Sequence, residues 1–103
     1  MRIEVIGDDT ISQQARTYAE YRVFAALTQT TDADKVRHVR VLLRPIRSRT
    51  ACEDIACTVT VALEGSDSFR IRTTGPHAYA AINRVVERIG TSLSTVMADR
   101  VSV

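Results

Sequence analysis

Apolar residues recur at steps of three and four over the last third of the chain, and this stripe constrains the fold more than any other feature. It consists of Ala78, Ile82, Val85, Ile89, Leu93 and Val96. Such spacing marks one face of an α-helix. Gly75-Pro76 should open this helix, because the N–H that proline lacks is not needed at the first helical position. Gly90 lowers helix stability by about 1 kcal/mol relative to Ala but does not end so strong a pattern. We expect the tail, residues 99–103, to be frayed.

A second stripe with helical spacing lies between residues 11 and 28, a stretch without Gly or Pro. It consists of Ile11, Ala15, Tyr18, Ala19, Val23 and Ala26. Thr10 is the expected N-cap, with Gln13 as its capping-box partner. Arg22 falls inside the stripe, so its stem should pack while its guanidinium reaches solvent or a partner. Tyr21 and Phe24 point away from the stripe, and we expect them to pack under a neighbouring loop or sheet edge rather than to form a contact surface.

Four segments alternate apolar and polar residues at period two, which is typical of half-buried strands. They cover residues 2–6, 36–46, 55–63 and 68–72. Pro45 should limit pairing at the end of the second strand, with residues 47–50 as an exposed connection. The order predicts an α+β fold, a βαβββα two-layer sandwich in which a four-stranded mixed sheet carries both helices on one face. The first two strands should be parallel and the rest antiparallel.

The length and composition fit one soluble domain that spans residues 1–103. The chain is 45% apolar and 25% charged, which excludes disordered and membrane-embedded classes. No apolar run approaches the roughly 20 residues that a bilayer span requires. The first seven residues lack the layout of a signal peptide, so we expect a cytoplasmic protein without a membrane partner.

The formal net charge is only +2, which is small for a protein that binds nucleic acid. Lys35 is the only lysine, and the other basic residues are all arginine, whose planar fork suits phosphate. The charge is −2 over residues 1–35, +5 over 36–50, −4 over 51–69 and +3 over 70–103. Near-neutrality is therefore a cancellation between blocks of opposite charge.

The chain contains few cysteines and histidines, the residue types that most often act as nucleophiles, bases or metal ligands. Cys52 and Cys57 are five residues apart, on opposite faces of a strand, so we expect reduced, partly buried thiols. No metal-ligand spacing is present, and His38 and His77 suit surface roles. There is no nucleophile elbow and no phosphate-cradling glycine loop. The sequence therefore predicts no enzyme, no cofactor and no small-molecule substrate.

The sheet predicted above would collect arginines on its open face and at its end, which is the pattern of a phosphate-binding surface. The residues concerned are Arg40, Arg44, Arg47, Arg49, Arg70 and Arg72, with Arg2 on the first strand. Arg84 and Arg88 lie one turn apart on the last helix. Structured RNA is read largely by shape, so base-specific side chains are not required. The alternative for these arginines is a solvated face paired with Glu53, Asp54 and Glu64.

The order of elements, with a tyrosine early in the last helix, resembles the ribosome hibernation-promoting factor family, also known as ribosome-associated inhibitors or sigma-54 modulation proteins. The most specific part is residues 79–83, Tyr-Ala-Ala-Ile-Asn, where the family reads approximately Tyr-Ala-Ala-Ile-Asp. The family usually continues its last helix into a dense Lys/Arg run, whereas residues 92–97 here are uncharged. The resemblance is to a divergent short form, without the dimerising C-terminal domain of long members.

This resemblance implies a non-enzymatic factor that binds small-subunit rRNA near the decoding region and inhibits translation in stress or stationary phase. It also implies that Arg16 and Arg22 correspond to basic residues of the family's first helix, and Arg88 to a lysine of its last helix. The alternative function is a diverged protein–protein interaction module with the same fold that no longer binds ribosomes. That module would self-associate as a weak homodimer, through its exposed sheet or through Tyr21 and Phe24.

Overall fold

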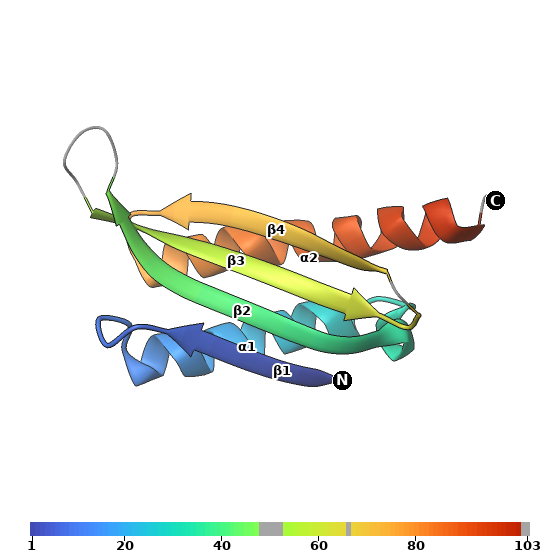
Figure 1. The fold of residues 1–103 in the computed structure, drawn as a ribbon, viewed down its shortest axis with the longest axis horizontal. Helices are drawn as coiled ribbons and strands as arrows, with labels where there is room; N and C mark the ends of the chain where they lie inside the picture. Colours follow the sequence, from blue (N-terminus) through green and yellow to red (C-terminus); the bar gives the residue numbers. More distant parts are fainter. Residues whose placement is uncertain (48–52, 66, 102–103) are drawn as a thin grey trace.

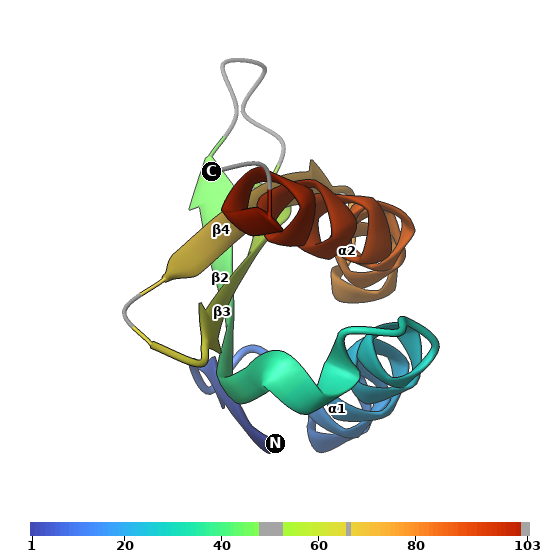
Figure 2. The ribbon, with the colours of Figure 1, turned by 90° about the vertical axis from the view of Figure 1, so that its right-hand side faces the viewer.

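One sheet and two helices form two layers in the computed structural model, which describes residues 1–47, 53–65 and 67–101. The elements are β1 (Arg2–Gly7), α1 (Gln13–Thr28), the 3-10 helix η1 (Ala33–Lys35), β2 (Val36–Arg47), β3 (Glu53–Leu63), β4 (Ser68–Gly75) and α2 (Ala78–Val101). The strand order is β1-β2-β3-β4, with β1 parallel to β2 and the other pairs antiparallel. Both helices cover the same sheet face (Figures 1 and 2). The predicted fold class and topology are confirmed.

The core lies between the sheet and the helices, and it takes every second residue of the central strands. Its largest fully buried side chains include Val39, Val41, Leu43, Val59, Val61, Ile82, Val85, Ile89 and Leu93. From α1 the buried residues are Ala15, Ala19, Val23 and Leu27, a strict series of steps of four. Leu27 was absent from the predicted stripe, which followed Ala26 instead. Burial of these alternate residues leaves the other face of the sheet to polar side chains.

Both helices begin later than the sequence indicates. The N-cap of α1 is Ser12, whose Oγ accepts a hydrogen bond from the Ala15 amide at 3.1 Å. Thr10 instead belongs to the preceding turn, where its amide donates to Asp8 Oδ1 at 2.9 Å. At the start of α2, the amide of Ala80 donates to His77 Nδ1 at 3.2 Å. The Nδ1 atom of His77 therefore caps α2, and Pro76 lies before the helix instead of at its first position.

Strand β2 and helix α2 both run further than predicted. Pairing of β2 with β3 continues past Pro45 to Arg47. Strand β1 ends opposite Leu43, so Pro45 stands at a free edge where its missing N–H costs no ladder bond. Helix α2 continues to Val101 instead of fraying from residue 99, because Val96 and Met97 still pack against the core. The predicted connection after Arg47 lies outside the described residues.

Strand β4 and the start of α2 approach each other closely at Gly75. The Thr73 hydroxyl donates a buried hydrogen bond to the carbonyl oxygen of Ala81 at 2.7 Å. A Cβ placed on Gly75 would lie 2.8 Å from the Ala81 amide nitrogen and 2.9 Å from Ala80 Cβ. Backbone cannot yield as a flexible side chain does, so only glycine fits between this strand end and this helix.

We predict that Gly75→Ala lowers the free energy of unfolding by about 1 to 3 kcal/mol, the usual cost of overpacking a tight contact. Gly90→Ala is the matched control, because its new Cβ would meet only Thr30 Cγ2 at 3.8 Å. Inside a helix this change should raise stability by roughly 0.5 to 1 kcal/mol. Urea denaturation of the two variants measures both effects, and equal stabilities would contradict the close approach at Gly75.

Candidate nucleic-acid interface

The open face of the sheet carries rows of side chains that cross the strands. One row runs from Glu4 through Arg40 and Thr60 to Arg70. The next joins Leu42, Thr58 and Arg72, which are likewise register partners. Neighbouring strands lie about 4.8 Å apart, so Arg40 and Arg70, two strands apart, flank Thr60 at about 10 Å from each other. The strand register therefore sets the spacing of these guanidinium groups.

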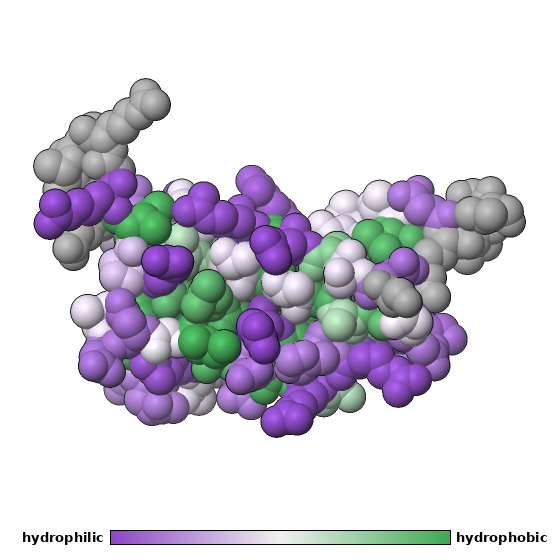
Figure 3. Space-filling model, in the orientation of Figure 1, coloured by the Kyte–Doolittle hydropathy of each residue, from purple (hydrophilic) through white to green (hydrophobic). Residues whose placement is uncertain are grey.

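These rows enclose a shallow hollow of about 380 Å³. Its lining residues are Arg40, Leu42, Arg44, Ile46, Thr58, Thr60, Arg70 and Arg72. Figure 3 shows this face, with hydrophilic side chains around a hydrophobic patch. Guanidinium groups donate paired hydrogen bonds to phosphate oxygens, and the threonine hydroxyls add further donors. The aliphatic side chains of Leu42 and Ile46 can pack against a sugar or the edge of a base. The arrangement suits a polyanion that also has apolar parts.

A second hollow, of about 400 Å³, continues the first around the edge of the sheet. Arg72, Thr73 and Thr74 of β4 line it together with Arg84 and Arg88 of α2. The Arg84 guanidinium donates a hydrogen bond to the Thr74 carbonyl oxygen, which holds it against the strand. Arg72 lines both hollows, so the two are neighbours. We call the combined set the arginine surface, and it consists of Arg40, Arg44, Arg70, Arg72, Arg84 and Arg88.

The other arginines proposed from the sequence lie elsewhere. Arg16 donates to the carbonyl oxygens of Gly7 and Asp8, at 3.0 and 2.8 Å, and so ties α1 to the loop after β1. The guanidinium carbon of Arg22 lies 5.9 Å from the centroid of the Tyr18 ring. Both arginines belong to α1, in the helix layer, rather than to the open face. Arg47 is exposed at the end of β2, and Arg49 lies outside the described residues.

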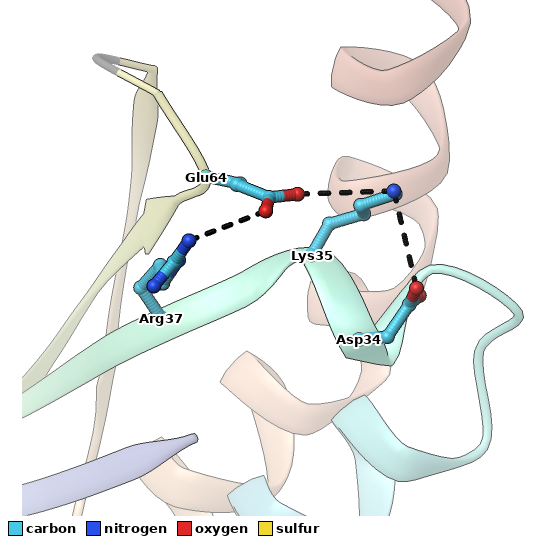
Figure 4. A network of polar contacts seen from close by, with 4 residues as sticks. All are labelled: Asp34, Lys35, Arg37 and Glu64. Atoms are coloured by element: carbon cyan, nitrogen blue, oxygen red, sulfur yellow. Dashed lines mark hydrogen bonds and ion pairs between the residues drawn. The ribbon is translucent and has the colours of Figure 1, made fainter.

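Acidic side chains pair mostly away from the arginine surface. Glu64 contacts Arg37 at 3.2 Å and Lys35 at 3.7 Å, and Lys35 also contacts Asp34 at 3.9 Å (Figure 4). Of the three acids in the alternative, Glu64 therefore pairs with Lys35 and Arg37 rather than with the arginine surface, and the solvated face stays a prediction. Within the described part of the chain, the one ion pair found on the arginine surface joins Arg40 to Glu4, at 3.7 Å. Arg44, Arg70, Arg72 and Arg88 take part in none of the ion pairs found in this part of the chain.

Asp8 directly follows β1, and hydrogen bonds from Thr10 lower the pKa of its carboxyl. The Thr10 hydroxyl, followed by the Thr10 amide, lowers the pKa of the Asp8 carboxyl below its ordinary value. The charges of Arg16 and Arg44 act in the same direction with smaller effect. Asp8 therefore remains ionised at neutral pH, which places a negative charge near the Arg44 end of the open face.

The described residues offer little for catalytic or membrane chemistry. No group of three or more His, Cys, Asp and Glu within them is placed to hold a metal ion. None of the helices in that part of the chain is long and apolar enough to cross a membrane. Cys57 is fully buried on β3, beyond the partial burial predicted, while Cys52 lies outside the described residues. Burial raises the pKa of the Cys57 thiol to about 12.

We predict that Cys57 resists thiol reagents in the folded protein. At pH 8, a pKa of about 12 leaves about one thiolate in ten thousand, and the thiolate is the nucleophile. In a Cys52→Ser variant, labelling by a chromogenic disulfide should be slow in buffer and stoichiometric in denaturant. Fast labelling of the folded variant would show that β3 opens readily, contrary to its central position.

The fold of this chain, but not its sequence, is similar to that of a known protein. No family model matches the chain, and no curated protein matches it by sequence. Among solved structures, a ribosomal subunit interface protein from Coxiella burnetii superimposes with a TM-score of 0.74 at 18% sequence identity. The match covers 95% of this chain and 99% of that chain. The two proteins share a fold over nearly their whole length.

Several features of the interface carry only a weak signal in the sequence. Thr58 and Thr60 are predicted to face away from the core, but nothing in their spacing marks them as lining residues. The same holds for Leu42 and Ile46, which alternate with arginines on β2. Knowledge of the strand register is needed to see that these four side chains lie between arginines of two strands. Period-two alternation is the signal that finds them once the sheet is assembled.

Proposed function

We propose that this chain is a non-enzymatic, ribosome-associated factor that binds small-subunit rRNA near the decoding region and inhibits translation in stress or stationary phase. The observation that carries the proposal is the arginine surface, which lines two neighbouring hollows on the open sheet face and beside α2, on a fold shared with a ribosomal subunit interface protein. The order of elements and the tyrosine segment at residues 79–83 support the same family. The protein would act by occupying space on the subunit.

Phosphate contacts explain how a nearly neutral domain binds RNA. Binding of each arginine to a phosphate releases condensed counterions, so affinity depends on local positive charge and falls as salt rises. The ion pairs of Glu64 with Lys35 and Arg37 lie outside the two hollows, and no acidic side chain of the described residues lines either hollow. The local charge of the surface is therefore far more positive than the net charge of +2 indicates. Structured RNA presents phosphates in a fixed geometry that such a surface matches by shape.

We predict that the protein sediments with purified small ribosomal subunits and that its affinity falls steeply from about 50 to about 200 mM salt. The double variant Arg70→Gln/Arg72→Gln should bind at least about tenfold more weakly and show a salt slope shallower by about two. Adding Arg84→Gln and Arg88→Gln should abolish sedimentation with the subunit. Gradient sedimentation at several salt concentrations measures each effect.

The matched control is Lys35→Gln/Arg37→Gln, which removes the same charge from the Glu64 ion pairs rather than from the arginine surface. Its affinity for the subunit should equal that of the unaltered protein. Circular dichroism confirms that each variant is folded. Equal loss in both double variants would show that net charge alone drives binding, and no loss in either would exclude the arginine surface as the contact.

A second candidate function is a protein–protein interaction module with the same fold. The observation that favours it is the exposure of two aromatic side chains on α1, 69% for Tyr21 and 48% for Phe24. The expectation that these rings pack under a loop or sheet edge is therefore wrong. Failure to sediment with small subunits at low salt, together with a mass that rises with protein concentration, would favour this function over ribosome binding.

A further inference from the structure

Strand β1 forms one free edge of the sheet. In the described part of the chain it pairs only with β2, and Figure 1 shows it along one margin of the molecule. An edge strand presents a row of unpaired N–H and C=O groups that another strand can pair with. Natural proteins usually block such edges, so the side chains on β1 decide whether this edge is closed or available.

The charged side chains of β1 are opposite in sign and two residues apart. Arg2 and Glu4 both face the open side, because they are the register partners of His38 and Arg40. Ile3, between them, faces the helix-covered side and packs against the core. Glu4 contacts Arg40 at 3.7 Å and His38 at 3.6 Å on its inner side. Both Arg2 and Glu4 are exposed on this edge strand.

This pattern is complementary to itself in one register. Antiparallel pairing of two β1 strands centred on Ile3 sets Arg2 opposite the second copy's Glu4, and the same contact repeats on the other side of the two-fold axis. Centring on Arg2 or on Glu4 instead sets identical charges opposite each other, which is destabilising. Opposite charges on facing positions favour the pairing of two strands. Of the registers centred on Arg2, Ile3 and Glu4, the charges therefore favour the one centred on Ile3.

The other edge of the sheet disfavours the same pairing. Strand β4 presents Arg70 and Arg72 on the open side, so antiparallel self-pairing centred on Arg70, Ile71 or Arg72 would set arginine opposite arginine. The side chain of Arg84 also occupies the carbonyl oxygen of Thr74. Of the two edges, β1 alone has charges that favour a second copy.

Apolar side chains lie beside the β1 edge on the helix-covered side. A groove of about 490 Å³ separates β1 from α1 and is lined by Met1, Ile3, Thr17, Glu20, Tyr21 and Phe24. Figure 2 shows β1 and α1 along the same lower side of the molecule. A two-fold axis perpendicular to the sheet keeps both α1 helices on one side of the junction. The exposed rings of Tyr21 and Phe24 then lie near those of the second copy, where burial removes apolar area from water.

We propose that two copies of this chain form a symmetric homodimer by antiparallel pairing of β1 with β1, centred on Ile3. The two four-stranded sheets join into one continuous sheet, and the paired edges are no longer exposed. Both open faces stay on the same side of this sheet, away from the junction of the helices. Each copy therefore presents its arginine surface in the dimer, and the inference does not depend on what that surface binds.

Exchange of charge on β1 tests the register directly. In a homodimer of the Arg2→Glu variant, the introduced glutamate lies opposite Glu4 of the second copy. In a homodimer of the Glu4→Arg variant, the introduced arginine lies opposite Arg2. Each single variant should therefore self-associate at least about tenfold more weakly than the unaltered protein, because like charges face each other. An equimolar mixture of the two variants pairs opposite charges again, so it should form heterodimers. Sedimentation velocity over a range of concentrations, without ribosomes, measures all three samples.

Two controls separate the interface from net charge and from folding. Arg47→Glu makes the same change in charge at the exposed end of β2 as Arg2→Glu makes on β1, and it should leave dimerisation intact. Circular dichroism shows whether the β1 variants keep their fold, and the mixture tests the register even if each variant is somewhat less stable. A monomeric unaltered protein, single variants that dimerise normally, or a mixture that stays monomeric would each overturn the proposal. None of these results bears on whether the monomer binds ribosomes.

Discussion

Burial of a single face of the sheet is the constraint on which the rest of the structure depends. Two helices cover the same side, so each strand sends most of its apolar residues to that side and most of its polar residues to the other. On β2 this rule assigns Val39, Val41 and Leu43 to the core and leaves Arg40 and Arg44 in water. The arginine surface is thus a consequence of the packing that stabilises the fold, and no separate scaffold is needed to present it.

The parts of the fold that depend on periodicity were predictable from the sequence. Steps of three and four identify α2 through Ile82, Val85 and Ile89, and alternation identifies all four strands. Helix starts were less predictable, because local signals compete: Thr10 and Ser12 are both good caps, and only the turn at Asp8 shows that Thr10 is engaged elsewhere. Strand ends were missed for a related reason, since the effect of a proline depends on which neighbouring strand has already ended.

The candidate site was predictable in part, because the alternation that identifies the strands also shows which arginines share the open face. Arginines on strands follow from alternation, and the resemblance to hibernation factors directed attention to α1 and α2. The sequence alone does not show which partner each charged side chain contacts. Arg16 satisfies two carbonyl oxygens across the loop after β1, and Glu64 meets Lys35 and Arg37 across a strand pair. Such contacts join residues that are separated in the sequence. They determine which of the charged side chains are already engaged within the protein and which can contact a ligand.

The close approach at Gly75 has a consequence for recognition. The same joint that brings β4 against α2 also fixes Arg72 relative to Arg84 and Arg88, which stand on different elements. Under the proposed function, a bound polyanion would order side chains held on two closely packed elements, and little entropy would be lost in ordering the backbone. Such a site would favour a ligand whose negative charges already have the matching spacing. It would bind folded polyanions more tightly than flexible ones that carry the same total charge.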